Sequence, residues 1–451
     1  MPQNDEATGA SPADSETETL GLQDALPGRA PIRQFRLRVL DGPSSGLTFT
    51  SSRPRTVLGK YPSADFVLKD PTVSRFHCEL EIEEDQVVVR DLKSRNGTFV
   101  DGTKVLVSWL HHGATLKLGQ TKLRFELRSE KVLVPLSTRV RFGSMVGHSA
   151  VMREAFAVLE LAAKSNATLL LSGETGTGKD LAAESVHFKS DRSEGPFVVV
   201  DCAAIPPNLL ESQLFGYERG AFTGADREHM GAVETASGGT LFLDEVAELS
   251  LDLQPKLLRV LEQRAVQRLG SNQPIPVDVR IIAATNRNLR EEVNAQRFRS
   301  DLFYRLAVVE LVLPPLRKRT EDIPLLVGEI LGSLETEGTN VFDEFRTSEF
   351  FEDLARHIWP GNVRELRNYL ERCALLGTLA PLADEHETDN PPPIDVERPL
   401  SAARQLWLQW FEKRYLEELL RKTDNNVSAA ARMARVDRAH FHRLLSRSGL
   451  R

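Results

Sequence analysis

Hydrophobic and polar positions divide the chain into three stretches with different periods. Between Phe35 and Leu127, short alternating runs such as FRLRVL, CELEIE and KLRFEL are separated by Gly, Pro, Asp and Asn. This period of two predicts an all-β sandwich over residues 33–129. Residues 145–378 combine solid apolar runs with helical spacing, which predicts an α/β domain with a helical lid. From residue 403 to 451 only helical spacing remains, so the chain is predicted to be multidomain with an all-α end.

The intervening stretches lack a regular apolar period. Residues 1–32 are rich in Ser, Thr, Asp, Glu and Gly, which predicts a disordered acidic tail. Within it, Thr17 and Thr19 lie among glutamates, and a kinase target is the alternative interpretation. Residues 130–144 are predicted to be a linker, and residues 379–402, rich in Pro and acids, a flexible one. A helical pattern begins at residue 145 and runs to residue 161.

Composition limits the class of protein. The 451 residues are 41% hydrophobic and 27% charged, as is usual for globular proteins of roughly two to four domains. The cysteines Cys78, Cys202 and Cys373 are far apart and form no C-x-x-C, which argues against disulfides and against a zinc site. No apolar run approaches ~18 residues, and the N-terminus has no signal pattern. We therefore expect a cytoplasmic protein with no membrane partner.

A glycine-rich loop follows the apolar run ATLLLS and precedes a helical stretch that begins at Leu181. The order of strand, glycine-rich loop and helix is the context that a P-loop requires. Backbone N–H groups would hold the phosphates of ATP, and Lys179 would reach the β- and γ-phosphate oxygens. The predicted nucleotide-binding residues are Gly173, Glu174, Thr175, Gly176, Thr177, Gly178, Lys179 and Asp180.

Two carboxylates end a second apolar run, GTLFLDE, at Gly239–Glu245. After a P-loop this pattern predicts that Asp244 holds Mg²⁺, directly or through water. Glu245 is then predicted to orient and polarise the attacking water. A further strand-like run, Val277–Ala284, ends in Thr285 and Asn286.

The stretch Glu211–Ala225, ESQLFGYERGAFTGA, places one aromatic residue, Phe222, among glycines and small residues. A hairpin whose Phe is buried in the core is the ordinary interpretation. The whole string instead resembles the signature of the bacterial enhancer-binding proteins, AAA+ ATPases that remodel sigma-54 RNA polymerase. In that family this loop contacts sigma-54 and is moved by ATP hydrolysis. The resemblance assigns sigma-54 contact to Gly220, Ala221, Phe222, Thr223, Gly224 and Ala225.

The resemblance covers nearly all of residues 35–451 and implies further roles. Asn286 resembles sensor I, a polar side chain near the γ-phosphate. Arg299 and Arg305, in FRSDLFYRL, resemble arginine fingers presented to the ATP of the next subunit. Arg364, in WPGNVRELRN, resembles sensor II, which contacts the nucleotide. The resemblance thus implies a homo-oligomeric ring, a hexamer or heptamer, and a dimer when inactive.

Loops of the predicted sandwich carry three polar motifs, L-G-K, S-R-F-H and S-R-N-G-T. Together they resemble a forkhead-associated (FHA) domain, a reader of phosphothreonine peptides. A phosphate dianion favours a hydroxyl, a guanidinium and backbone N–H donors on a rigid rim. His77 is expected to brace the loops, and a domain used only for self-association is the alternative. The resemblance assigns phosphopeptide binding to Lys60, Ser74, Arg75, Ser94, Arg95 and Asn96.

The C-terminal stretch is basic although the whole chain has a net charge of −7. From residue 401 onward the chain has eleven basic and five acidic residues, and this excess of positive charge favours contact with DNA phosphates. Helical runs at 410–420, 428–433 and 437–446 resemble a Fis-type helix-turn-helix, whose second helix enters the major groove. A pair of solvated charged helices is the alternative. The predicted contacts to double-stranded DNA are Arg438, His440, His442 and Arg443.

Four positions depart from the family pattern. Asp180 stands where P-loops usually have Ser or Thr, although acidic residues are common there in the enhancer-binding proteins. Asp201 replaces an Asn that restrains the catalytic Glu, so coupling between nucleotide state and loop movement is expected to differ. Lys60 replaces an Arg and loses its bidentate fork. Arg435 replaces the Gly of the turn, at a cost of about 1–2 kcal/mol.

The sequence therefore predicts a transcriptional regulator that binds upstream DNA, uses ATP and Mg²⁺, and remodels sigma-54 RNA polymerase. Its predicted input is phosphothreonine, on a partner protein or on its own tail. A phosphopeptide-binding scaffold is one alternative, and intact Lys179, Asp244 and Glu245 argue against it. An AAA+ remodeller of another target is the other, and the GAFTGA loop argues against that.

Overall fold

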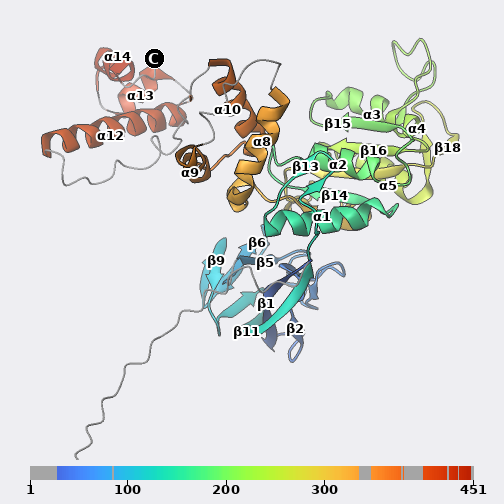
Figure 1. The fold of residues 1–451 in the computed structure, drawn as a ribbon, viewed down its shortest axis with the longest axis horizontal. Helices are drawn as coiled ribbons and strands as arrows, with labels where there is room; N and C mark the ends of the chain where they lie inside the picture. Colours follow the sequence, from blue (N-terminus) through green and yellow to red (C-terminus); the bar gives the residue numbers. More distant parts are fainter. Residues whose placement is uncertain are drawn as a thin grey trace, which may run out of the picture. The chain divides into compact units, whose positions relative to one another are not determined.

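The computed structural model describes residues 28–83, 86–334, 347–376, 379, 400–423, 426–434 and 436–447 (Figure 1). These residues belong to two compact units, residues 1–371 and 372–451, and each is described by itself. None of the helices within the described ranges is long and apolar enough to cross a membrane.

The first part of the larger unit is a sandwich of two sheets. One sheet has the strand order β2-β1-β11-β10-β7-β8 and the other β4-β3-β5-β6-β9. Residues that alternate along these strands, such as Phe35, Leu37 and Phe125, are fully buried between the sheets, as the period of two predicts. The strands are β1 (Arg29–Asp41), β2 (Thr48–Thr50), β3 (Arg55–Gly59), β4 (Phe66–Val67), β5 (Cys78–Glu83), β6 (Gln86–Asp91), β7 (Thr98–Val100), β8 (Thr103–Val105), β9 (Val107–Leu110), β10 (Thr115–Leu118) and β11 (Thr121–Pro135).

The sandwich extends past both of its predicted limits. Strand β1 begins at Arg29, inside the predicted tail, and β11 continues to Pro135, inside the predicted linker. The two extensions pair with each other, with Arg29 opposite Pro135. Charged residues mixed with Val132 and Val134 conceal this strand in the sequence. The connection to the next domain is therefore shorter than residues 130–144.

The second part is built on a parallel sheet of five strands in the order β15-β16-β19-β14-β20, with helices around it (Figure 1). Its strands are the short, almost wholly apolar runs that a sheet covered on both faces requires. They are β14 (Leu169–Ser172), β15 (Phe197–Asp201), β16 (Thr240–Asp244), β19 (Arg280–Thr285) and β20 (Val309–Val312). The helical pattern predicted from residue 145 begins only at Ala150, because Ser149 caps helix α1 (Ala150–Ala163) and β12 (Arg141–Phe142) pairs with β13 (Met145–Val146) before it.

The remaining elements of this unit surround the sheet and continue into a helical lid. Around the sheet they are α2 (Lys179–Phe188), α3 (Pro207–Phe215), α4 (Ala232–Thr235), η2 (Val246–Glu248), α5 (Gln254–Gln263), β17 (Ala265–Gln267), β18 (Pro274–Pro276), α6 (Leu289–Asn294) and α7 (Ser300–Leu306). In the lid they are η3 (Leu316–Lys318), η4 (Thr320–Asp322), α8 (Ile323–Leu334), α9 (Ser348–Arg356) and α10 (Asn362–Leu376). The last residues of α10 belong to the smaller unit.

Past the end of α10, the described residues of the smaller unit form the helices α12 (Leu400–Lys422), α13 (Val427–Met433) and α14 (Arg438–Arg447). Leu416, Ala430 and Phe441, one from each helix, are buried in a common core. Asn426 caps α13 through a hydrogen bond from the Ala429 N–H. These helices agree with the all-α prediction, although α12 begins earlier than the predicted helix at residue 410. The turn residue Arg435 lies outside the described residues.

Candidate functional site

The predicted nucleotide residues meet at one edge of the parallel sheet. The P-loop follows β14, Asp244 ends β16 and Asn286 follows β19. Because parallel strands have their carboxyl ends at the same edge, these segments lie side by side. Asp201 ends β15 at the same edge and stands opposite Asp244. Sequence and topology therefore place a phosphate-binding loop beside a pair of carboxylates.

The P-loop has a backbone that glycine must supply. Gly176 and Gly178 have φ angles of +79° and +97°. A Cβ atom at Gly176 would lie only 2.2 Å from the carbonyl oxygen of Gly361 in the lid. Helix α2 begins directly after this loop, at Lys179, so its N-terminal N–H groups point toward any phosphate bound there.

Lys179 is held inside the loop with its charge close to the catalytic carboxylates. Its side chain is 7% exposed, and its Nζ donates to the carbonyl oxygens of Gly173 at 2.9 Å and Glu174 at 3.2 Å. The Nζ lies 4.0 Å from Glu245 Oε1. Burial lowers the pKa of Lys179, and the nearby carboxylates oppose that shift. A bound phosphate would give this buried ammonium a direct anionic partner.

The two carboxylates after β16 are positioned by backbone bonds. Glu245 has a φ of +50°, and its Oε2 accepts a hydrogen bond from the Asn286 N–H at 2.9 Å. Asp244 Oδ1 accepts from the Glu245 N–H at 3.0 Å. Burial raises the pKa of both side chains. A carboxylate pair in this environment fits a divalent cation, and Mg²⁺ is commonly held by one or two carboxylates together with substrate phosphates.

Asn286 links this carboxylate pair to the P-loop. Its Nδ2 donates to Thr175 Oγ1 at 3.4 Å, while its backbone holds Glu245. Asp201, in contrast, uses its Oδ1 to accept from the N–H groups of Ala203 at 2.9 Å and Ala204 at 3.0 Å. It therefore caps its own turn, and its negative charge contributes to the raised pKa of Asp244. Asp180 is exposed in the first turn of α2.

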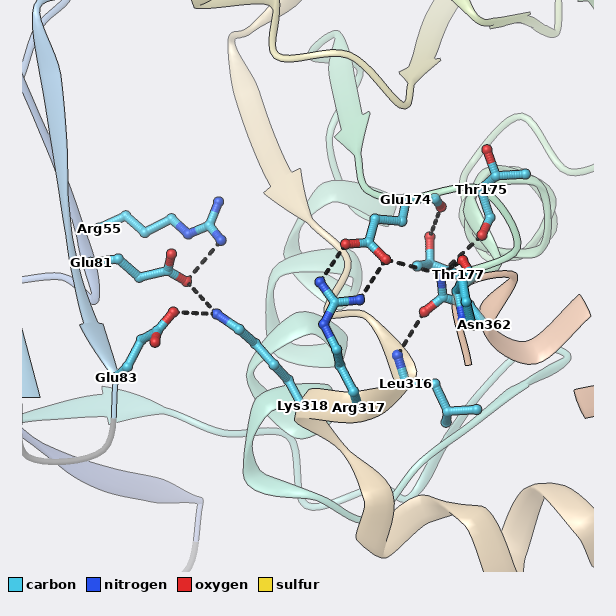
Figure 2. A network of polar contacts seen from close by, with 11 residues as sticks. Arg55, Glu81, Glu83, Glu174, Thr175, Thr177, Leu316, Arg317, Lys318 and Asn362 are labelled. Atoms are coloured by element: carbon cyan, nitrogen blue, oxygen red, sulfur yellow. Dashed lines mark hydrogen bonds and ion pairs between the residues drawn. The ribbon is translucent and has the colours of Figure 1, made fainter. Parts of the chain in front are cut away.

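A network between the P-loop and the lid was missed in the sequence (Figure 2). Asn362 is fully buried at the start of α10, and its Nδ2 donates to Glu174 Oε2 at 3.2 Å and to the Thr175 carbonyl at 3.0 Å. Arg317 donates to both oxygens of Glu174, at 2.7 and 2.5 Å. The signal was present in W-P-G-N-V-R-E-L, where only Arg364 was considered. The carboxylate of Glu174 is thus bound to the lid.

Two more contacts join the lid to the loop. The Val363 N–H donates to the Gly176 carbonyl at 3.0 Å. Arg364, the next residue of α10, therefore lies beside the P-loop and is exposed. Arg319 is 3% exposed, and its Nη2 donates to the Thr177 carbonyl at 3.1 Å. Burial lowers the pKa of Arg319 to about 10. In the sequence, Arg319 was concealed within the charged run LRKRTED.

Arg299 and Arg305 lie on α7 and at its start, on the surface of the domain. Arg299 is paired with Asp301, with an Nη2–Oδ2 distance of 2.6 Å, and Arg305 with Glu262, with an Nη2–Oε1 distance of 3.1 Å. Their side chains are 44% and 55% exposed. Both guanidinium groups are therefore accessible to another molecule.

The GAFTGA residues form a compact turn with its aromatic side chain exposed. The Gly220 N–H donates to the Ala225 carbonyl at 2.8 Å and closes the turn. Gly220 and Gly224 have φ angles of +83° and +99°. Phe222 is 45% exposed, and its ring meets the ring of Tyr217 edge-on, with centroids 5.0 Å apart. The alternative of a buried Phe is not what the structure shows.

Arg268 supports the base of this turn and was also missed in the sequence. Its guanidinium binds three carboxylates, with distances of 2.7 Å to Glu234, 3.2 Å to Glu218 and 3.1 Å to Glu228. Hydrogen bonds to Glu234 and the surrounding negative charge raise its pKa. The side chain is 12% exposed, so these ion pairs fix both ends of the segment that carries Phe222.

The predicted phosphopeptide residues form one rim of the sandwich. Arg75, Arg95 and Asn96 are exposed there. Ser74 Oγ accepts from the Arg95 N–H at 2.9 Å, and the exposed Lys60 donates its Nζ to the Pro71 carbonyl at 3.2 Å.

Hydrogen bonds between the loops hold this rim together. Asn96 Nδ2 donates to the Thr72 carbonyl at 2.7 Å. His77 is fully buried, accepts from the Ser74 N–H at 3.1 Å, and lies 3.2 Å from the Gly97 carbonyl oxygen. Ser94 donates its hydroxyl to Asp91 at 2.6 Å, so it cannot donate to a phosphate while that bond is formed.

The predicted DNA residues all belong to α14. His440 is exposed and His442 is half-buried. The side chains of Arg438 and Arg443 lie outside the described part of the chain.

Comparison with known families divides the chain in the same way. The family model described as "Sigma-54 interaction domain" matches residues 145–312, and "AAA+ ATPase lid domain" matches residues 317–386. The model described as "Inner membrane component of T3SS, cytoplasmic domain" matches residues 38–129.

A curated relative and two solved structures are similar to parts of the chain. The transcriptional regulatory protein ZraR of Escherichia coli is 44% identical over 317 residues, which are 69% of this chain and 70% of that protein. The crystal structure of NtrX from Brucella abortus in complex with ADP is 34% identical, with a TM-score of 0.49, over 68% of this chain and 70% of NtrX. The FHA domain of CT664 from Chlamydia trachomatis is 32% identical, with a TM-score of 0.20, over 21% of this chain and 96% of that domain.

Proposed function

The chain belongs to the sigma-54-dependent transcriptional regulators, a family of AAA+ ATPases, and we propose that it uses ATP hydrolysis to convert sigma-54 RNA polymerase into the open promoter complex. The observation that carries this proposal is the pairing of two surfaces on one domain. Lys179, Asp244 and Glu245 gather at the sheet edge, and the exposed Phe222 stands on a braced turn elsewhere.

The chain's own residues divide the work at the sheet edge. ATP supplies the phosphoanhydride bond, and Mg²⁺ would neutralise charge on its phosphates. Lys179 and the P-loop N–H groups bind the phosphates, and Asp244 would hold the metal. Glu245, oriented by the Asn286 N–H, would take the proton of the attacking water. Arg364 of the lid would contact the same nucleotide.

Open-complex formation tests the proposal directly. Purified chain, sigma-54 RNA polymerase and promoter DNA with its upstream region are mixed with ATP, and unpaired thymines are detected by permanganate reactivity. We expect melting that needs both this chain and hydrolysable ATP. Hydrolysis without any melting would contradict the proposed function and favour an AAA+ remodeller of another target.

Replacing Phe222 with alanine should separate hydrolysis from remodelling. Phe222 is exposed and contacts Tyr217 alone among aromatic rings of the described residues, so its loss should leave ATP turnover within about 2-fold. Open-complex formation should fall by more than about 10-fold, since truncating an aromatic anchor commonly costs 2 kcal/mol or more. Steady-state ATPase rates and permanganate reactivity measure the two effects.

Met230→Ala is the matched control for Phe222→Ala. Met230 is 51% exposed and lies outside the GAFTGA turn, so its variant should keep both activities. A large loss of ATPase activity in Phe222→Ala would mean that the turn is structural.

We further propose that the sandwich binds phosphothreonine and that the C-terminal helices bind upstream double-stranded DNA. Arg75, Arg95 and Asn96 present a guanidinium pair and an amide on one exposed rim. The local excess of basic residues from residue 401 supports a contact of α14 with DNA. The two arginines, Arg299 and Arg305, are proposed to act within a homo-oligomeric ring.

Replacing Arg75 with alanine should weaken phosphothreonine binding. Charge-assisted bonds from one guanidinium to a phosphate are worth roughly 1.5–3 kcal/mol, which predicts a loss of about 10-fold or more in affinity. Fluorescence anisotropy with a degenerate phosphothreonine peptide pool measures this. A second arm uses peptides of residues 12–24 phosphorylated at Thr17 or Thr19, which separates the chain's own tail from a partner protein.

Arg38→Ala, an exposed arginine on β1 of the sandwich, is the matched control and should bind as the parent does. The unphosphorylated pool sets the background. Equal binding by the Arg75 variant and the parent would remove Arg75 from the proposed site.

A further inference from the structure

The sandwich is packed into the ATPase domain through a phenylalanine that follows the phosphate-binding pair. Phe76 is fully buried in the same apolar cluster as Phe303 and Leu306 of α7. Its ring meets Phe303 edge-on, with centroids 5.3 Å apart. The guanidinium of Arg290 lies over both rings, 5.7 Å from Phe76 and 5.4 Å from Phe303. An aromatic side chain buried in this way favours a specific docked arrangement.

One amide of the ATPase domain joins the two loops of the predicted phosphopeptide rim. Asn294, the last residue of α6, donates through Nδ2 to the carbonyl oxygens of Phe76 and of Leu92, the latter at 2.7 Å. Its Oδ1 accepts from the Phe76 N–H at 3.5 Å. Phe76 follows Ser74 and Arg75, and Leu92 precedes Ser94. Asn294 therefore ties both loops to one side chain of the ATPase domain and helps to fix their spacing.

Charged contacts surround this aromatic and amide centre. Lys93 pairs with Glu291 of α6, with an Nζ–Oε2 distance of 2.9 Å. Figure 2 shows two neighbouring residues of η3 with different partners, Lys318 with Glu81 and Glu83 of the sandwich and Arg317 with Glu174 of the P-loop. Lys318 Nζ lies 3.3 Å from Glu81 and 2.5 Å from Glu83. Exposed ion pairs contribute little energy each. These pairs nevertheless place the sandwich edge at Lys318, which is next in sequence to Arg317, the partner of Glu174.

Residues 286–306 form a segment that contacts the sandwich and also carries the two proposed finger arginines, Arg299 and Arg305. Asn286 begins it at the nucleotide edge, α6 holds the rim loops through Asn294, and α7 meets Phe76 and Tyr61 through Phe303 and Tyr304. Arg299 and Arg305 flank those same aromatic residues in the sequence and remain exposed. Docking thus holds α7 while leaving both guanidinium groups accessible.

From this geometry we propose that phosphothreonine binding at the rim and the placement of the finger helix α7 are coupled through Phe76 and Asn294. The inference rests on the proposed phosphothreonine recognition. A ligand that bridges Ser74–Arg75 and Arg95–Asn96 needs the two loops at a fixed spacing, and Asn294 supplies that preorganisation. By linkage, the ligand in turn favours the docked arrangement of α6 and α7.

The test changes the ATPase domain and measures binding at the sandwich. In the full chain, Asn294→Ala should weaken binding of the tightest peptide from the phosphothreonine pool by about 5-fold or more, the usual lower range for coupled sites. Retained binding of a fluorescent ATP analogue shows that the variant is folded. In the parent chain, hydrogen exchange of amides 289–306 should slow when the peptide is added, and Asn294→Ala should lose that protection.

Asn166→Ala also removes an amide side chain, an exposed one that contacts Arg192 instead of the sandwich, and should bind peptide as the parent does. Unchanged peptide affinity in Asn294→Ala, with the parent binding normally, overturns the coupling and leaves phosphothreonine recognition in place. A parent chain that binds no phosphopeptide overturns the recognition itself. The two failures are therefore distinct.

Discussion

Replacing Glu245 with glutamine should leave ATP binding intact and lower turnover by about 10²–10⁴-fold, the usual contribution of a positioned general base. Glutamine keeps the length of the side chain and can still accept the bond that Glu245 Oε2 receives from the Asn286 N–H. It cannot take a proton from water. Glutamine also avoids the additional change of placing alanine at a residue whose φ is +50°. Titration with a fluorescent ATP analogue and steady-state phosphate release measure the two properties.

Two further variants are compared with Glu245→Gln, one that should lose ATP binding and one that should behave as the parent does. Lys179→Ala should lose tight ATP binding itself, because it removes the buried ammonium that lies within the P-loop. Glu248→Gln changes a nearby glutamate that pairs with Arg287 and should hydrolyse ATP as the parent does. Parent-like turnover in Glu245→Gln would remove Glu245 from the role of base.

The chemistry at the sheet edge could be predicted because each of its parts is local in sequence. The glycines that the P-loop backbone requires, Gly176 and Gly178, lie within three residues of Lys179. Of the two carboxylates, Asp244 is the last residue of an apolar strand and Glu245 follows it. Local sequence therefore determines local structure, and parallel topology brings the pieces together. The exposed Phe222 was instead predicted from the resemblance of the whole string to the enhancer-binding signature, and the flanking Gly220 and Gly224 have the positive φ angles of the turn that presents it.

The supports of this site could not be predicted, because they join residues distant in the chain. Glu174 meets Arg317 over a separation of 143 residues and Asn362 over 188. Nothing in a charged run shows which distant carboxylate it will bind. Phe76 presents the same difficulty. An apolar residue between Arg75 and His77 is typical of a sandwich core, and only the structure shows that its ring enters the neighbouring domain.

The sandwich limits were missed for a different physical reason. Strand extensions at Arg29–Arg33 and at residues 131–135 pair with each other. Their alternation is weak because charged residues occupy many of the positions, and Val134 is the buried residue of the later extension. The resulting ladder makes the connection to the ATPase domain short. A short connection and the docked Phe76 together replace the longer linker that was predicted over residues 130–144.

Mixing two inactive variants should restore ATP hydrolysis if the arginine fingers act between subunits. Arg305→Ala alone should lose about 10³–10⁵-fold of turnover, the range known for arginine fingers. Lys179→Ala alone should be inactive because it does not hold ATP. In a mixed assembly, an Arg305→Ala subunit binds ATP and an adjacent Lys179→Ala subunit supplies Arg305. We expect the mixture to recover several per cent of parent activity, measured as phosphate release at equal total protein.

The geometry supports this expectation because Arg305 is paired with Glu262 on the domain surface and its side chain is 55% exposed. Turnover per subunit should accordingly rise with protein concentration, since hydrolysis needs a neighbour. Arg259→Ala, an exposed arginine on α5 that bonds Gln263 and Gln267, is the matched control and should neither lose activity nor rescue Lys179→Ala beyond the level given by the parent. A specific activity independent of concentration into the nanomolar range, together with no recovery in the mixture, would establish that each subunit hydrolyses ATP alone.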